Sequence, residues 1–164
     1  MTTKHNAEDT ICPVARGLNV VGDKWSVLIL RELFMGNQRF DGLQAQTGAT
    51  PQMLASRLKK LTQAAVIERR LYQARPARYE YVLTEMGKGY FPILNGMRAW
   101  GETWCKPDAT ARAVDYVHVP CGEDPGLGPV CQHCHAEIRL QDLEMRLSSG
   151  FKDERDKRSL QHAG

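Results

Sequence analysis

The 164-residue chain lacks any apolar run of membrane-spanning length, and its first ten residues, MTTKHNAEDT, lack the apolar segment of a secretion signal. These two absences argue against a membrane protein and against an exported one. The five cysteines are therefore expected to face a reducing cytoplasm, where clustered cysteines serve metal or redox chemistry more often than structural disulfides. We expect a cytoplasmic protein that makes no contact with a membrane.

The chain also lacks a strong excess of charge of either sign, because 22 Lys or Arg residues face 19 Asp or Glu residues and the formal net charge is only +3. Such a modest excess does not by itself indicate a nucleic-acid partner. The charge is unevenly distributed, however, since residues 1–104 carry +5 and residues 105–164 carry −2. Hydrophobic residues make up 42% of the chain, which is enough for a packed core and argues against global disorder. The length suits one domain with an appendage, and the basic excess belongs to the first part.

The segment from Thr50 to Ala65 has the pattern of an amphipathic helix. Thr50 can cap its amino terminus and Pro51 suits the first helical position, where a missing N–H costs nothing. Four apolar side chains recur at intervals of four, three and four and form one stripe: Leu54, Leu58, Leu61 and Ala65. The polar residues away from this stripe are Gln52, Ser56, Lys59, Lys60 and Gln63, with Arg57 at its flank. Such groups hydrogen-bond base edges and phosphates in a major groove, although a solvated helix face has the same composition.

The preceding residues favour the nucleic-acid interpretation of this helix. A short helix begins near Phe40 and can close at Gly48, since glycine accepts the left-handed turn found at many helix ends. A helix, a turn containing glycine and a second helix together form a helix-turn-helix pattern. In that pattern the second helix enters the major groove.

The residues that follow predict a basic β-hairpin. Segments 66–72 and 79–83 are rich in β-branched, aromatic and aliphatic residues, as strands are. The polar segment between them carries Arg75 and Arg78 at the expected tip. Seven lysines or arginines and one acidic residue lie from Arg57 to Arg78. This concentration of positive charge is typical of a wing that contacts backbone phosphates.

Cys12 stands apart from the other four cysteines, at the start of a helix predicted from Pro13 to Val21. A thiol at a helix amino terminus can be reactive, yet a small buried structural group would leave the same signal. The sequence alone favours the structural interpretation. A further helix is predicted from Lys24 to Met35, with its core positions at Trp25, Leu28, Ile29 and Leu33.

A long helix is predicted to begin at Glu85, with Thr84 as its cap and an early interruption at Pro92. Large apolar residues recur along it, beyond the compact domain core: Phe91, Leu94, Met97 and Trp104, with Trp100 close to the stripe. An intrachain core is one way to cover them. A two-fold homodimer is the preferred interpretation, because helix-turn-helix proteins usually read paired half-sites as symmetric dimers.

Two metal-binding knuckles are predicted near the carboxyl terminus, at His118-Val119-Pro120-Cys121 and Cys131-Gln132-His133-Cys134. One imidazole and three thiolates make a soft tetrahedral set suited to structural zinc. Only nine residues separate the knuckles, and the rival ligands are His133, His135 and Cys105. The alternative is a flexible tail with incidental cysteines. We favour zinc because a segment with so few large apolar residues needs a crosslink to fold.

Several motifs together resemble the HxlR-type transcriptional regulators, which are bacterial relatives of the MarR winged-helix dimers. They occur in the expected order over roughly residues 11–104: Cys12-Pro13-Val14, Gly22-Asp23-Lys24-Trp25, Leu28-Ile29-Leu30-Arg31-Glu32-Leu33, Arg39-Phe40, Leu58-Lys59-Lys60-Leu61, Tyr79-Glu80-Tyr81 and Leu83-Thr84-Glu85-Met86-Gly87. The resemblance implies dimeric repressors or activators that bind operators. In some members a cysteine that matches Cys12 senses electrophiles or oxidants, and the resemblance extends that expectation to this thiol. It does not cover the tail.

The predicted fold is mainly α with a small β-hairpin, an α+β winged helix-turn-helix with a carboxyl-terminal extension for which a zinc ribbon is one candidate. We expect a flexible arm at residues 1–10 and a DNA-binding and dimerisation domain at residues 11–106. The extension should occupy residues 107–147, with a short helix at 138–147, and a disordered tail should follow at residues 148–164.

The predicted function is transcription regulation rather than enzymatic catalysis. The protein is expected to bind double-stranded DNA as a homodimer, to hold zinc as a structural cofactor and to respond to redox or electrophile stress through an unidentified inducer. Residues expected on DNA are Arg39, Thr50, Gln52, Ser56, Arg57, Lys59, Lys60, Arg75 and Arg78. One alternative is a zinc-stapled protein-interaction module that does not bind DNA. The other is a redox protein that uses Cys131 and Cys134, although the strand–helix–strand context of that motif is missing.

Overall fold

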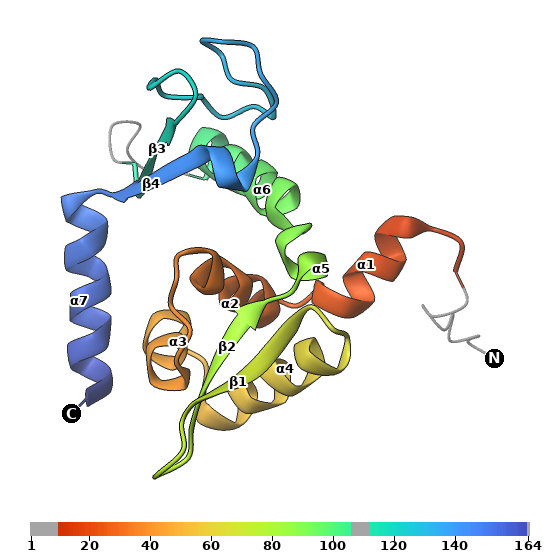
Figure 1. The fold of residues 1–164 in the computed structure, drawn as a ribbon, viewed down its shortest axis with the longest axis vertical. Coiled ribbons are helices and arrows are strands. Elements are labelled where there is room, and N and C mark those ends of the chain that lie inside the picture. Colours follow the sequence, from red (N-terminus) through yellow and green to blue (C-terminus); the bar gives the residue numbers. More distant parts are fainter. Residues whose placement is uncertain (1–9, 106–111, 164) are drawn as a thin grey trace. The chain divides into compact units, whose positions relative to one another are not determined.

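The computed structural model describes residues 10–105 and 112–163, which form two compact units that divide between Gly87 and Lys88 (Figure 1). The first unit contains α1 (Pro13–Val21), α2 (Lys24–Phe34), α3 (Phe40–Thr47), α4 (Pro51–Gln63), β1 (Ile67–Gln73) and β2 (Arg78–Leu83). Helix α5 (Glu85–Lys88) lies at the division. The second unit contains α6 (Phe91–Trp104), β3 (Val114–His118), the 3-10 helix η1 (Leu140–Asp142), β4 (Leu143–Leu147) and α7 (Ser149–Ala163).

Helix α2 supplies much of the core of the first unit. Its amino terminus is capped by Asp23, whose carboxylate accepts hydrogen bonds from the amides of Trp25 and Ser26 at 3.1 and 3.0 Å. Ile29 and Leu33 are buried, as their helical spacing predicts, whereas Trp25 is only half-buried. Leu30 and Phe34 are buried as well, so the buried face of α2 is turned relative to the one that the sequence pattern indicates.

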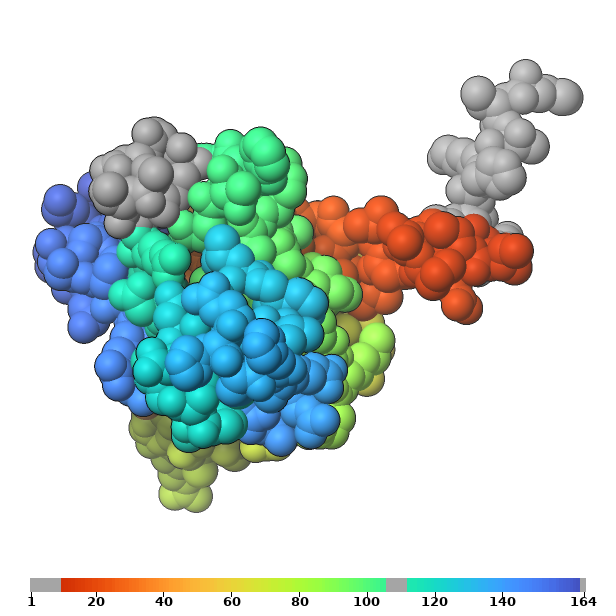
Figure 2. All heavy atoms as spheres, turned by 90° about the horizontal axis from the view of Figure 1, so that it is seen from above, coloured from red at the N-terminus to blue at the C-terminus, as the bar shows by residue number. Residues whose placement is uncertain are grey.

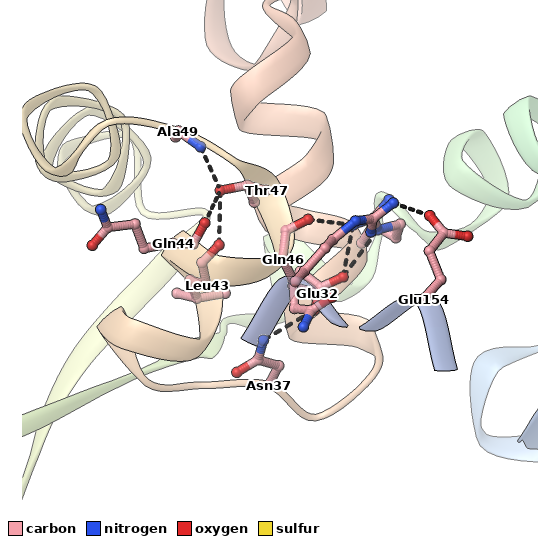
Figure 3. Close-up of polar contacts among 10 residues, drawn as sticks. Glu32, Asn37, Leu43, Gln44, Gln46, Thr47, Ala49 and Glu154 are labelled. Carbon is pink, nitrogen blue, oxygen red and sulfur yellow. Dashed lines mark hydrogen bonds and ion pairs between the residues drawn. The ribbon is translucent and has the colours of Figure 1, made fainter. Parts of the chain in front are cut away.

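A buried polar network joins α2 to the helix-turn-helix (Figure 3). The carboxylate of Glu32, which is fully buried, accepts hydrogen bonds from Arg31 at 2.8 and 3.1 Å and from Asn37 at 3.0 Å. In α3, the hydroxyl of Thr47 donates to the carbonyl of Leu43 at 2.7 Å and accepts from the amide of Ala49 at 3.3 Å. A buried carboxylate is tolerated only when such partners satisfy it, so this network holds the turn in one conformation.

The turn and α4 follow the predicted pattern closely. Gly48 ends α3 in the left-handed conformation, with a φ of 70°, and the hydroxyl of Thr50 accepts a hydrogen bond from the amide of Met53 at 3.3 Å. The buried side chains of α4 are Leu54, Leu58 and Leu61. The helix ends at Gln63, so Ala65 does not extend the apolar stripe. It is exposed and has a φ of 57°, which belongs to the turn into β1.

The hairpin predicted after α4 is present (Figure 1). β1 and β2 pair antiparallel from Ile67 opposite Leu83 to Gln73 opposite Arg78, with an irregularity between Leu71 and Gln73. The sheet gains a short additional pairing on its other side, where the amide of Tyr81 donates to the carbonyl of Gln38 at 2.9 Å. This contact fixes the base of the hairpin to the residues that lead into α3.

In the second unit, α6 begins anew at Phe91, directly before Pro92, as the early proline predicts. The amides of Ile93 and Leu94 donate to the carbonyl of Tyr90, both at 3.1 Å. Strands β3 and β4 pair antiparallel, with Val114 opposite Leu147 and His118 opposite Leu143.

Two expectations for the carboxyl-terminal residues were wrong. Residues 138–147 were expected to form a helix, but they form η1 and then β4. In β4 three half-buried apolar residues alternate with Glu144 and Arg146, which is the two-residue period of a strand. Residues 148–164 were expected to be disordered, but Ser149–Ala163 form α7. The hydroxyl of Ser148 caps this helix through the amide of Phe151 at 3.2 Å, and an ion pair joins Glu154 to Arg158 one turn later.

The division of the chain also differs from the domain boundary predicted at residue 106. Helix α6 belongs to the second unit rather than to the winged-helix unit. Its Arg98 lies over the ring of Tyr116, 4.2 Å from the centroid, and donates from Nη2 to the carbonyl of Gly126 at 3.3 Å. The extension is therefore packed on α6.

Candidate nucleic-acid interface and metal site

The solvent-facing side of α4 carries side chains that can read DNA. Gln52, Ser56 and Lys59 are exposed at spacings of four and three residues, so they share one helical face. The three buried leucines occupy the opposite face. Thr50 is exposed at the amino terminus, but its hydroxyl is already engaged as the helix cap. Lys60 is half-buried at the edge of the exposed face.

Arg57 has a different environment from its neighbours on α4. Its Nε lies 3.1 Å from Oδ1 of Asp23, the cap of α2, and forms an ion pair there. Partial burial raises the pKa of Asp23, but hydrogen bonds from the side chain and amide of Ser26 and the charges of Arg57 and Lys60 lower it overall. Arg57 therefore fastens α4 to α2 in this structure.

The hairpin presents its cations along its length and at its tip. Arg75 and Arg78 are both exposed, in and beside the turn that joins the strands. The guanidinium of Arg39, the residue directly before α3, lies over the ring of Tyr72 in β1 at 4.9 Å from the centroid. Arg69 lies over Tyr79 at 3.5 Å. Stacking on aromatic faces orders these arginines while leaving their N–H groups available to an anion.

An open groove of about 430 Å³ lies between α4 and the hairpin. Its lining residues are Ala55, Lys59, Thr62, Gln63, Arg69 and Tyr81. Lys59 and Arg69 face the same space from two different elements, which makes the groove attractive to a phosphate. Arg69 was not among the residues that the sequence analysis assigned to DNA. It lies opposite Tyr81 in the hairpin register, and both side chains line the groove.

The exposed apolar stripe of α6 consists of partly different residues from those predicted to form a subunit interface. Phe91 is only 5% exposed and Leu94 is half-buried, so both contribute to packing within the chain. The exposed apolar residues of the helix recur at intervals of four, three and four: Ile93, Met97, Trp100 and Trp104, which are 57, 49, 61 and 74% exposed. The sequence pattern predicted Met97 and Trp104 correctly as members of this stripe. It did not include Ile93, and it placed Trp100 close to the stripe rather than in it.

Helix α1 carries a second exposed apolar face. None of its residues is buried, and Val14 and Leu18 are exposed together with the preceding Ile11. In Figure 2 the red and orange spheres of this helix project from the rest of the first unit. Cys12 lies directly before the helix and is exposed. Its exposure removes the interpretation as a small buried group.

The four predicted metal ligands come together in the second unit. His118, Cys121, Cys131 and Cys134 each offer one donor atom, and all four atoms lie within 4.8 Å of one another. Nδ1 of His118 lies 3.3 Å from the sulfur of Cys121 and 3.3 Å from that of Cys134. The sulfurs of Cys121 and Cys131 are 3.8 Å apart. Among the described residues this cluster excludes the rival ligands His133, His135 and Cys105.

The cluster fits a tetrahedral zinc ion. With zinc–sulfur bonds of about 2.3 Å, two ligands of a tetrahedron are separated by about 3.8 Å, which is the distance between the sulfurs of Cys121 and Cys131. Tight turns aim the donors: the amides of Cys121 and Gly122 donate to the carbonyl of His118 at 3.1 and 2.8 Å. In the second knuckle the amide of His135 donates to the carbonyl of Cys131 at 2.9 Å. Nine intervening residues are therefore enough to close the site.

The thiols of the cluster have unequal environments. A hydrogen bond from the backbone amide of Cys134 is the main cause that lowers the pKa of Cys131. The amide of Glu123 lowers the pKa of Cys121, but partial burial and the thiols of Cys134 and Cys131 raise it overall. The pKa values of these two neighbouring thiols are therefore shifted in opposite directions.

The loop between the knuckles is attached to its surroundings on both sides. The carboxylate of Asp124 accepts from Arg112 at 2.6 Å and from the amide of Gly126 at 2.8 Å. The carbonyl of the buried Pro125 accepts from the amide of Gln132 at 3.1 Å, and that of Gly126 accepts from Arg98. The metal-site loop is therefore connected directly to α6.

The helix-turn-helix and hairpin define the class of winged helix-turn-helix transcription regulators. The family model described as "HxlR-like helix-turn-helix" matches residues 20–109, and the chain belongs to this family. The uncharacterized HTH-type transcriptional regulators Mb3122 of Mycobacterium bovis and Rv3095 of Mycobacterium tuberculosis are each 36% identical over 141 residues. That alignment covers 85% of this chain and 87% of theirs.

No helix within residues 10–105 and 112–163 is long and apolar enough to span a membrane.

Solved structures support the same assignment. The structure of PA1607, provisionally described as a transcription factor, matches with a TM-score of 0.66 and 32% identity over 87% of this chain and 97% of that one. The redox regulator HypR in its oxidized form matches with a TM-score of 0.53 and 31% identity, over 59% of this chain and 99% of that one. HypR is therefore a shorter protein, whereas PA1607 is similar over most of this chain.

Proposed function

We propose that this protein regulates transcription by binding operator DNA as a homodimer. The observation that carries the proposal is the exposed polar face of α4, whose opposite face is buried through three leucines. A hairpin with exposed arginines follows this helix. Gln52 and Ser56 are assigned to base edges in the major groove. Lys59 and the wing residues Arg75 and Arg78 are assigned to phosphates.

The remaining predicted contacts take more specific roles under this proposal. Thr50 caps α4 and offers its backbone near the helix start, and Lys60 is a peripheral phosphate contact. Arg69, ordered by Tyr79, lines the groove beside the hairpin, and Arg39, ordered by Tyr72, is assigned to a phosphate. Arg57 positions α4 through Asp23 and does not meet DNA itself.

The homodimer is assigned to the exposed apolar faces of α6 and α1. Four large side chains along one face of α6 would otherwise remain in water, at a cost of about 25 cal/mol for each Å² of apolar surface. Burying them against a second copy also supplies two recognition helices for paired half-sites.

Operator binding is tested by genome-wide mapping of bound sites, followed by titration of a recovered site at several salt concentrations. The double variant Arg75→Ala, Arg78→Ala should weaken binding to all sequences and lower the salt slope by about two units. Gln52→Ala should instead relax sequence preference at a cost of about 1–3 kcal/mol. Arg139→Ala, an exposed arginine of the second unit, is the control and should change neither. Binding that does not weaken as salt is raised would favour the protein-interaction module over this proposal. Equal operator binding by the double variant would remove the wing contacts from it.

We further propose that Cys12 responds to oxidants or electrophiles. It is exposed at the start of α1, and the structural relatives include the redox regulator HypR. Oxidant treatment should change operator affinity in the wild type and not in Cys12→Ser. A Cys12→Ser protein with an unchanged oxidant response would remove Cys12 from the mechanism.

The second unit is proposed to hold one structural zinc ion through His118, Cys121, Cys131 and Cys134. The match between the measured sulfur separation and tetrahedral coordination supports this assignment. The same cluster accounts for Cys131 and Cys134, which favours a metal site over a redox enzyme. Elemental analysis should find about one zinc per chain in the wild type and less in Cys131→Ser. His133→Ala is the matched control, because its side chain lies outside the cluster, and it should keep the metal.

A further inference from the structure

The metal-site cysteines have a geometry suited to a second reaction. The sulfurs of Cys121 and Cys131 are 3.8 Å apart and unbonded, and a disulfide needs about 2.05 Å. We propose that the cluster is an oxidative modification site, in which a peroxide joins Cys121 to Cys131, releases the metal and alters α6. This proposal rests on the metal site proposed above and is separate from the assignment of Cys12.

Within the Cys121–Cys131 pair, the exposure of the two thiols sets the order of events. Cys121 is half-buried and reachable from solvent, whereas Cys131 is fully buried. The thiolate of Cys121 attacks hydrogen peroxide: a sulfur–oxygen bond forms, the oxygen–oxygen bond breaks and hydroxide leaves. The neighbouring thiolate of Cys131 then attacks the sulfenic sulfur, so that the disulfide forms and a second hydroxide departs. Two thiolates are oxidised and one peroxide is reduced to two hydroxides.

Metal release follows from the loss of ligands. Zinc binds thiolates, and neither sulfur of a disulfide carries the negative charge that holds the ion. Oxidation removes two of the four donors and leaves His118 and Cys134. Because Cys134 is exposed, the two remaining ligands do not form a closed site.

The contacts of the loop provide a path from the cluster to α6. Cys131 is followed by Gln132, whose amide donates to the carbonyl of Pro125. The residue after Pro125 is Gly126, whose carbonyl accepts a hydrogen bond from Arg98. The guanidinium of Arg98 also lies over the ring of Tyr116. Movement of Cys131 toward Cys121 therefore displaces the loop that holds Arg98. Arg98 belongs to α6, so the displacement reaches that helix.

The test uses the full chain with Cys12→Ser and Cys105→Ser, so that only the cluster thiols remain. The zinc-loaded protein is treated with one equivalent of hydrogen peroxide, and zinc release is followed with a metallochromic dye. Disulfides are located by alkylation and peptide mass mapping. The expected result is a rise from almost no released zinc to about one ion per disulfide, with Cys121 joined to Cys131. A reductant together with added zinc should reverse the change.

The coupling to α6 is read separately by tryptophan fluorescence after Trp25→Phe, which leaves Trp100 and Trp104 as reporters. Peroxide should shift this fluorescence, and Arg98→Ala should abolish the shift while zinc release persists. The control Arg139→Ala should behave as the parent protein. A fluorescence response that survives in Arg98→Ala overturns the proposed path.

The outcomes separate the two proposals. A protein that takes up no zinc when reduced refutes the metal site. A protein that holds zinc but keeps it when oxidised refutes only the modification site. Release with a Cys131–Cys134 bond, or with cysteine sulfinic acid in place of a disulfide, also overturns the assignment of the Cys121–Cys131 pair.

Discussion

Leu58 and Lys59 are neighbours on α4, and their alanine variants should lose different properties: folding stability for Leu58 and operator binding for Lys59. Leu58 is 1% exposed and packs beneath the helix, whereas Lys59 is exposed and lines the groove beside the hairpin. Leu58→Ala removes buried methyl groups and leaves a cavity, at a cost of about 2–5 kcal/mol in the free energy of unfolding. Lys59→Ala removes a solvated charge and should change that free energy by less than about 0.5 kcal/mol.

Urea denaturation followed by far-UV circular dichroism measures the first effect. All variants are compared at one protein concentration, because the apparent stability of a dimer depends on it. Operator titration measures the second effect: Lys59→Ala should bind more weakly and lower the salt slope by about one unit. The folded fraction of Leu58→Ala should bind the operator with the same salt slope as the wild type. A Leu58→Ala protein as stable as the wild type, or a Lys59→Ala protein with unchanged operator binding, would refute this division of α4 into two faces.

Three other perturbations have defined outcomes. Asp23→Ala removes the cap of α2 and the partner of Arg57, and should cost about 1–2 kcal/mol in urea denaturation. The folded pKa of Asp23 lies below its unfolded value of 3.8, so its stabilisation is present above that pH and is lost as pH falls through the folded pKa. Asp23→Ala should therefore show a smaller loss of stability on acidification than the wild type. Trp100→Glu places a charge within the exposed stripe of α6 and should yield monomers by light scattering, and dimers of undiminished affinity would contradict that interface. Zinc content measured after dialysis should fall as pH decreases, because protons compete for thiolate and imidazole ligands, and acid-resistant zinc would point to other donors.

The relatives differ in how much of this chain they match. HypR is matched over almost its whole length by 59% of this chain, whereas the mycobacterial regulators align over 85% of it. A cysteine response through Cys12 and one through Cys121 and Cys131 would act on different elements, α1 and α6.

The elements that local sequence patterns could predict are those whose side chains have a strong period and a clear cap. Leu54, Leu58 and Leu61 define the buried face of α4, and Thr50 defines its start. The alternation in β4 was equally regular, but η1 immediately before it obscured the change of period. Helix α7 was missed because it is highly charged, and its stability draws on Ser148 and the Glu154–Arg158 pair rather than on an apolar face.

The sequence by itself determined the winged helix-turn-helix, the polar face of α4, the basic hairpin and the four residues of the His/Cys cluster, because each is recognisable from residue types at short, regular spacing. Only the tertiary structure decided which apolar side chains are exposed and which charged side chains form ion pairs. It turned Arg57 toward Asp23, buried Phe91 while exposing Ile93, and brought Cys121 within 3.8 Å of Cys131. Those outcomes depend on which distant element packs against each residue, since burial and ion pairing are properties of neighbours in space and not of spacing along the chain.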